Sequence, residues 1–166
     1  MKIESRAVAN YSLFILNSSC IMATRISKNF TLEELTASAT AQAKGIHNVP
    51  STQQVANLCA LVHHVLQPLR DAMGQEIKIG SGYRCPRLNA AVGGVSNSQH
   101  MNGEAADLCI DGDKIKGKRW FDWIKAHVVF DQLIWEHSKT GSYWVHVSYR
   151  SDGKNRKQVT NDLLKK

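Results

Sequence analysis

Residues 98–113 read SQHMNGEAADLCIDGD, and this stretch decides the fold because it joins a loop to a buried strand. The small and apolar residues over 105–110, which a turn sequence follows, predict a strand. Just before this strand, Gly103 lets the backbone fold back closely. We therefore expect His100 to lie in the loop and Asp107 on the strand.

The other elements follow from hydrophobic spacing and from turn and capping residues. They are a short helix from Thr31, a loop or weak helix over 39–46, a helix over 51–73 that ends at Gly74, a strand over 77–79, a short helix and glycine-rich loop over 86–94, a helix over 114–127, and strands over 130–136 and 143–149. This order predicts an α+β fold, with a small antiparallel sheet and helices packed on one side of it.

The 166 residues suit one domain with short appendages. We expect an N-terminal extension over 1–29, a main domain over 30–150 and a basic C-terminal tail over 151–166. No run approaches the about 18 apolar residues that would predict a membrane span. The four cysteines form no C-x-x-C pair, so we predict neither a thiolate zinc site nor disulfides.

The first 21 residues differ from the rest of the chain. Their apolar patch, Leu13 to Leu16, is too brief for an ordinary signal peptide. Asn17 to Cys20 is faintly similar to a lipoprotein cleavage site, although the polar Asn17 does not fit. Translation that begins at Met22 is the other interpretation, and the sequence leaves an upstream extension and an export signal both open.

Two histidines and one aspartate are candidate ligands of a single metal ion. In Trp144-Val145-His146-Val147-Ser148 the valines face one side of a strand, and His146 faces the other with Trp144 and Ser148. His146 can therefore meet Asp107 across the sheet, and His100 can join them from its loop. Three such ligands leave the fourth position of a tetrahedral zinc site open, which is typical of catalytic zinc.

His63 and His64 are weaker candidates. Neighbouring residues on a helix point about 100° apart, so these two histidines cannot both face one metal. We predict surface or core histidines at both positions.

Three separated motifs resemble those of the zinc D-Ala-D-Ala carboxypeptidases and related peptidoglycan peptidases, which share the Hedgehog-type metallopeptidase fold. They are Ser81-Gly82-Tyr83-Arg84, Ser98-x-His100-x-x-Gly103-x-Ala105-x-Asp107 and Trp144-Val145-His146-Val147-Ser148. The resemblance covers roughly residues 30–149, and it implies one zinc ion held by His100, Asp107 and His146.

The same resemblance implies substrate-binding residues. Arg84 would hold a carboxylate or carbonyl of a peptide substrate, for which its planar fork of donors is suited. The alternative for Arg84 is a structural salt bridge. Tyr83 would orient the substrate or pack in the core, and Ser98 would bind the substrate or shape the turn before His100.

The general base is where the chain departs from the family pattern. An acidic residue commonly stands three positions before the last zinc histidine, but Tyr143 occupies that position here. We predict Glu136 as the substitute, because a residue on the paired strand shares the face of His146 when their cross-strand offset is even. Glu104 is the alternative. His137 is a possible proton donor, although a solvated loop histidine is the simpler reading.

The leading functional hypothesis is a zinc-dependent peptidase that hydrolyses peptidoglycan stem peptides, either as a D-Ala-D-Ala carboxypeptidase or as a muralytic endopeptidase. Glu136 would take a proton from the attacking water and pass it to the leaving amine. The alternative is a non-catalytic zinc module of the same fold that binds the cell wall or a protein. We expect a monomer that resembles phage lysins and reaches the wall through phage-type or other release, or through a weak export signal within 1–21.

The net charge of +7 favours an anionic partner. The sequence has no nucleic-acid motif and no basic run interleaved with aromatic residues, so we expect no nucleic-acid partner. A solubilising surface is the simpler explanation of the charge, and attraction to an acidic cell wall is the other.

Overall fold

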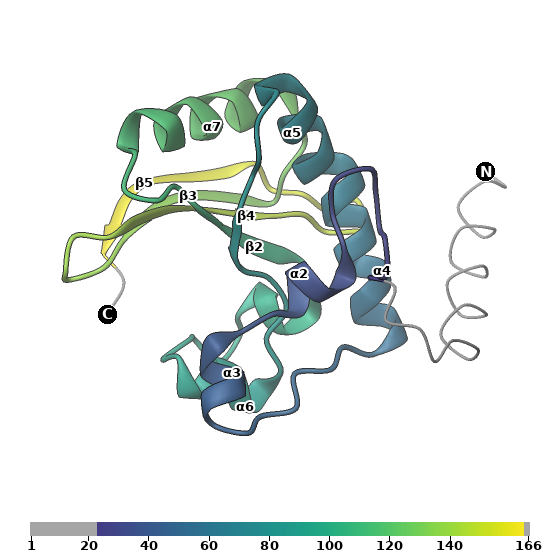
Figure 1. Ribbon diagram of the computed structural model, residues 1–166. Helices are drawn as coiled ribbons and strands as arrows, with labels where there is room; N and C mark the ends of the chain where they lie inside the picture. Colours follow the sequence, from purple (N-terminus) through teal and green to yellow (C-terminus); the bar gives the residue numbers. More distant parts are fainter. Residues whose placement is uncertain (1–22, 165–166) are drawn as a thin grey trace, which may run out of the picture.

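The structure, a computed structural model, describes residues 23–164. Its helices are α2 (Leu32–Thr36), α3 (Ala39–Ala43), α4 (Thr52–Leu61), α5 (Gln67–Met73), α6 (Pro86–Ala91) and α7 (Lys114–His127), with a π-helical turn at Val62–Leu66 and a 3-10 turn at Gln99–Asn102. Its strands are β1 (Ile79–Ser81), β2 (Ala105–Cys109), β3 (Gln132–His137), β4 (Tyr143–Ser148) and β5 (Gln158–Leu164). Figure 1 shows their arrangement and confirms the α+β class.

The five strands form one sheet in the order β1-β2-β4-β3-β5. The pairs among β1 to β4 are antiparallel, but β5 runs parallel to β3. The predicted antiparallel sheet is therefore confirmed for β1 to β4, and the edge strand β5, which the sequence did not predict, makes the sheet partly parallel. In the chain, β5 follows β4, which is antiparallel to β3. A single reversal after β4 therefore gives β5 the direction of β3, and the segment 149–157 only has to cross the end of β3 to place β5 beside that strand. The predicted tail over 151–166 thus contributes a strand.

One face of the sheet is apolar and is covered by α5 and α7 (Figure 1). Alternate strand residues on this face are buried in the same core cluster as residues of α7. The strand residues are Ala106, Leu108, Leu133, Val145 and Val147, and the helix residues are Trp120, Phe121 and Ile124. The short helices α2, α3 and α6 lie beyond the opposite face in Figure 1, which the sequence did not predict. This opposite face carries the polar residues described below.

Helix α7 has the predicted bounds, and its close packing depends on one glycine. Asp113 caps its N-terminus by accepting a hydrogen bond from the backbone N–H of Lys116. A Cβ at Gly117 would lie 2.6 Å from Ile110 Cγ2 and 2.8 Å from the ring of Trp135. The helix can therefore lie against the sheet only because residue 117 has no side chain.

The predicted helix over 51–73 is continuous, from the capping box of Ser51 and Gln54 to a left-handed Gly74. Its middle is the π-helical turn that contains His63 and His64. Both histidines are exposed, as predicted. In residues 23–164 no helix is long and apolar enough to cross a membrane.

Cys59, Cys85 and Cys109 are free thiols. The expectations for the leader-like patch, Cys20 and Met22 concern residues 1–22, which lie outside the described part of the chain.

Candidate metal centre

The three predicted ligands meet on the polar face of the sheet. Asp107 on β2 is the direct cross-strand partner of His146 on β4, and His100 reaches them from the 3-10 turn before β2. One ligand atom from each residue lies within 4.8 Å of the others. His100 and His146 are 2% and 7% exposed, and the Asp107 side chain is 14% exposed, so the group is largely but not completely buried.

A backbone carbonyl sets the orientation of His100. Its Nδ1 donates to the carbonyl oxygen of Gly82 over 2.7 Å, which leaves Nε2 pointing at Asp107 Oδ1, 3.2 Å away. Gly82 takes this place because it lies against α2, where a Cβ at residue 82 would be 2.2 Å from the carbonyl oxygen of Leu35. The glycine of the first motif thus orients the imidazole of the second.

The donor atoms fit a metal cation. Burial lowers the pKa of His100, which favours the neutral ring at pH 7. With Nδ1 donating to Gly82, the neutral ring has an acceptor at Nε2, and this acceptor faces a carboxylate oxygen. His146 Nδ1 lies 2.9 Å from the same oxygen. A cation between these atoms takes the place of the protons that otherwise join the imidazole nitrogens to the carboxylate, and two imidazole nitrogens with one carboxylate suit zinc.

Asp107 is held as a carboxylate by its neighbours. Burial alone would raise the pKa of Asp107, but His100 and His146 beside it hold that pKa well below its usual range. Its other oxygen, Oδ2, accepts a hydrogen bond from Arg84 Nη2 over 2.5 Å. Arg84 is 6% exposed, and its Nε also donates to Ser81 Oγ over 2.8 Å. Arg84 therefore orients Asp107, which is the salt-bridge alternative considered from the sequence.

The loop that carries His100 is held through its backbone carbonyls. Gln54 Nε2 donates to the carbonyl of Met101 and Asn57 Nδ2 to that of Asn102, each over 2.8 Å. The carbonyl of His100 accepts from the N–H of Arg84 over 3.1 Å. The loop closes at Gly103, which has a φ of +72° and lies so near α4 that a Cβ there would be 2.4 Å from the carbonyl oxygen of Gln54.

Glu136 shares the face of the three ligands. It pairs directly with Trp144 across the strands, and Ile134, two residues earlier, pairs with His146. The even offset predicted from the sequence is therefore present. Glu136 is 3% exposed, and its Oε2 accepts a hydrogen bond from Trp144 Nε1 over 2.8 Å.

The other predicted residues lie in different surroundings. Tyr83 is 4% exposed and belongs to the hydrophobic core, which favours the packing role. Ser98 precedes the 3-10 turn, and its carbonyl accepts from the N–H of Met101 over 3.1 Å, as a turn-shaping residue does. The Glu104 side chain accepts from Asn102 Nδ2 over 3.3 Å, at an exposed position.

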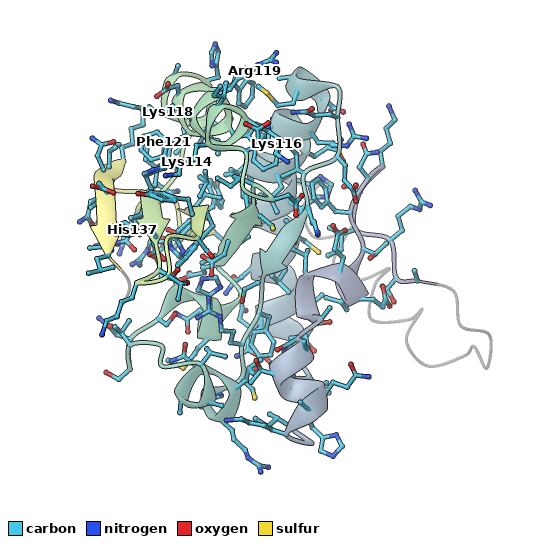
Figure 2. The ribbon with its side chains drawn as sticks, turned by 60° about the vertical axis from the view of Figure 1, so that its left-hand side comes forward. Lys114, Lys116, Lys118, Arg119, Phe121 and His137 are labelled. Carbon is cyan, nitrogen blue, oxygen red and sulfur yellow. The ribbon has the colours of Figure 1, made fainter. Side chains whose placement is uncertain are left out.

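His137 does not join the site. It alternates with Glu136 along β3 and so points to the other face, where it stacks on Tyr143 with ring centroids 5.1 Å apart. Its Nε2 lies 3.4 Å from Asp162 on β5, and Figure 2 shows His137 beside that strand. This placement does not support a role in proton transfer.

Basic side chains gather on the first half of α7, where Figure 2 labels Lys114, Lys116, Lys118 and Arg119. Several of these charges already have partners. The ammonium group of Lys114 lies 3.8 Å from the ring centre of Tyr143, while Lys116 and Lys118 pair with Asp111 and Asp122 at 3.7 and 2.7 Å. The positive charge of the chain is therefore partly balanced here, on the covered side of the sheet.

Three supporting hydrogen bonds were not predicted. The bond from Trp144 to Glu136 follows from the strand alternation that places Trp144 beside His146, once the register of β3 and β4 is known. The bonds from Gln54 and Asn57 to the ligand loop have no comparable signal, because they depend on how α4 lies against that loop.

Comparison with known proteins agrees with this geometry. The chain is 52% identical over 44 residues to the zinc D-Ala-D-Ala carboxypeptidase of Streptomyces albus G, and these residues make up 26% of this chain and 17% of that protein. The matched part thus covers less than a fifth of the relative. The comparisons and the His-Asp-His group together support zinc as the cofactor. The sequence model of the peptidase M15 family matches residues 28–148, which is most of the chain, and the protein therefore belongs to the peptidase M15 family.

Proposed function

We propose that this protein is a zinc-dependent peptidase that hydrolyses an amide bond in peptidoglycan stem peptides. The observation that carries the proposal is the convergence of His100, Asp107 and His146 beside the buried Glu136 on one face of the sheet. Membership of a peptidase family supports the reaction class, and the D-Ala-D-Ala carboxypeptidase activity named for the Streptomyces albus G relative supports the substrate class.

Each residue has a distinct task in this proposal. A zinc ion held by the three ligands would polarise the scissile carbonyl and promote ionisation of the attacking water near pH 7. Glu136 accepts the proton of that water and returns it to the leaving amine, as a general base and then a general acid. Trp144 holds the Glu136 carboxylate in place, and Arg84 holds Asp107.

The bond we propose first is the terminal D-Ala-D-Ala amide. A muralytic endopeptidase that cuts elsewhere in the stem would use the same centre, because the ligands and the acid define the reaction and the surrounding pocket defines the substrate. Digests of intact peptidoglycan separate the two. Release of free D-Ala supports the carboxypeptidase, and release of longer stem fragments supports the endopeptidase.

The function is tested with Glu136→Gln, which keeps the size and the acceptor oxygen of the side chain but removes its basicity. We expect at least a 100-fold loss of product release, measured by mass spectrometry, with zinc content unchanged. Glu104→Gln is the matched control, because Glu104 is next to the ligand loop but bonds only at an exposed position. This variant should keep wild-type activity.

Two results would redirect the assignment. Full activity of Glu136→Gln would show that another group is the base. A wild-type protein that binds zinc and wall material but releases no product would favour the non-catalytic zinc module.

A further inference from the structure

The strand β5 and the connection before it lie beyond the part of the chain that the family model matches, residues 28–148. This segment, residues 149–164, nevertheless contacts the parts that build the site. It pairs with β3, the strand of Glu136, and it ends a chain of hydrogen bonds that begins next to His100.

The first link joins Arg156 to Asp131. Asp131 is fully buried just before β3, and its two carboxylate oxygens accept from the backbone N–H, Nε and Nη2 of Arg156 over 3.0, 2.9 and 2.6 Å. These bonds from Arg156 lower the pKa of Asp131, although burial acts in the opposite direction. A guanidinium group that donates two hydrogen bonds to one carboxylate forms a strong ion pair with a fixed geometry.

The second link joins Asp131 to the ligand loop. Gln99 Nε2 donates to Asp131 Oδ2 over 3.0 Å, and Gln99 is the residue directly before His100. The carbonyl of Gln99 accepts from the N–H of Glu104 over 3.1 Å, so both its side chain and its backbone are held. The amide oxygen of Gln99 is buried and has no hydrogen-bond partner among residues 23–164, so the bond to Asp131 leaves this acceptor unsatisfied within the described part of the chain.

We propose that Arg156, Asp131 and Gln99 form a positioning clamp through which the C-terminal segment holds His100 in its metal-binding geometry. The inference rests on the proposed role of His100 as a zinc ligand. Outer residues that orient metal ligands typically affect metal affinity by about 10- to 100-fold. The clamp acts on His100 through the backbone of Gln99, so we expect an effect at the lower end of that range.

The test measures zinc release, which requires no turnover. Gln99→Met and Arg156→Met remove the two links while keeping side-chain length, and zinc transfer to a chromophoric chelator gives the dissociation rate. We expect each variant to lose zinc about 10-fold faster than wild type. The double variant should lose zinc no faster than the single ones, because the two links belong to one chain of bonds and are not independent. Arg156→Lys should be intermediate.

Arg150→Met is the matched control. Arg150 lies in the same segment and forms a similar fork with Asp152, at 3.2 and 2.6 Å, but that pair is near the surface. The charge of Arg150 acts on Glu104 and Asp131, while its guanidinium hydrogen bonds go to Asp152 and not to Gln99 or Asp131. Its zinc release should equal that of wild type. If Gln99→Met and Arg156→Met lower only the unfolding midpoint and release zinc at the wild-type rate, the segment is a general brace and the clamp is wrong. A lack of peptidase activity in the wild type would refute the proposed function but not this inference.

Discussion

Arg84 and His146 contact different oxygens of the same carboxylate. Arg84 Nη2 lies 2.5 Å from Asp107 Oδ2, and His146 Nδ1 lies 2.9 Å from Asp107 Oδ1. The arginine therefore occupies one oxygen and leaves the other to the side where the two histidines converge. In this way the first and last motifs of the sequence both contact the proposed ligand Asp107.

Arg84→Met should destabilise the protein. It leaves Asp107 Oδ2 buried without its charged partner, so we expect the free energy of unfolding of the zinc-free protein to fall by about 3 kcal/mol. Urea unfolding after removal of zinc measures this. Lys78→Met is the control, because it breaks an ion pair with Asp111 whose side chains are 59% and 49% exposed. Its loss of stability should be far smaller than that of Arg84→Met, because solvent screens an exposed ion pair. Equal losses in the two variants would contradict the account of Arg84.

Trp144→Phe should impair catalysis without affecting zinc. It removes the N–H donor to Glu136 Oε2 but keeps an aromatic ring on the strand. A hydrogen bond to a charged group is worth about 1.5–3 kcal/mol, so we expect kcat to fall on the order of 10-fold, with KM and zinc content close to wild type. Trp123→Phe on α7, where the indole stacks on His127, should leave kcat unchanged. A change in KM alone would indicate that Trp144 contacts substrate instead.

Gly103→Ala should be among the most damaging glycine substitutions. Its backbone has a φ of +72°, and the new Cβ would lie 2.4 Å from the carbonyl oxygen of Gln54. Gly93→Ala is the matched control, with a φ of +71° and no atom within 4 Å of the new Cβ. Both variants incur the backbone strain of about 1–2 kcal/mol, but only Gly103→Ala adds a collision. Equal unfolding midpoints for the two variants would show that the ligand loop can shift away from α4 without a loss of stability.

Asp131 should contribute to the acid sensitivity of the fold. Bonds from Arg156 lower the pKa of Asp131 below its ordinary value of 3.8. A group whose pKa falls on folding stabilises the protein above that ordinary value, and this contribution is lost as the pH drops through the folded-state pKa. The difference in unfolding free energy between wild type and Asp131→Asn should therefore be constant near pH 6 and shrink below pH 3.8.

Much of the site follows from strand alternation. Once Trp144 to Ser148 is taken as a strand, His146 must face away from Val145 and Val147, and a paired strand can supply Asp107 on that same face. The same reasoning placed Glu136 on the face of His146, because this placement requires only an even cross-strand offset between the two residues in the hairpin. These predictions succeeded because a strand has a period of two residues whatever surrounds it.

The parts that were missed depend on tertiary contacts without a local pattern. The residues of β5 alternate poorly, and its parallel pairing with β3 depends on the path of the segment before it. For Arg84 the sequence left substrate binding and a structural salt bridge open, because it does not reveal that the turn at Gly82 buries the side chain against Asp107. The clamp of Arg156, Asp131 and Gln99 likewise joins three segments that are distant in sequence.

The most direct test of the central claim is a zinc titration of the metal-free protein, with release of D-Ala or stem fragments from peptidoglycan followed by mass spectrometry. The account predicts no release from the metal-free protein, and activity that rises with added zinc to a plateau at one equivalent. His146→Ala should show neither tight zinc binding nor release at any zinc concentration. Undiminished release from the metal-free protein, or from His146→Ala, would contradict the claim that these three residues form a zinc peptidase centre.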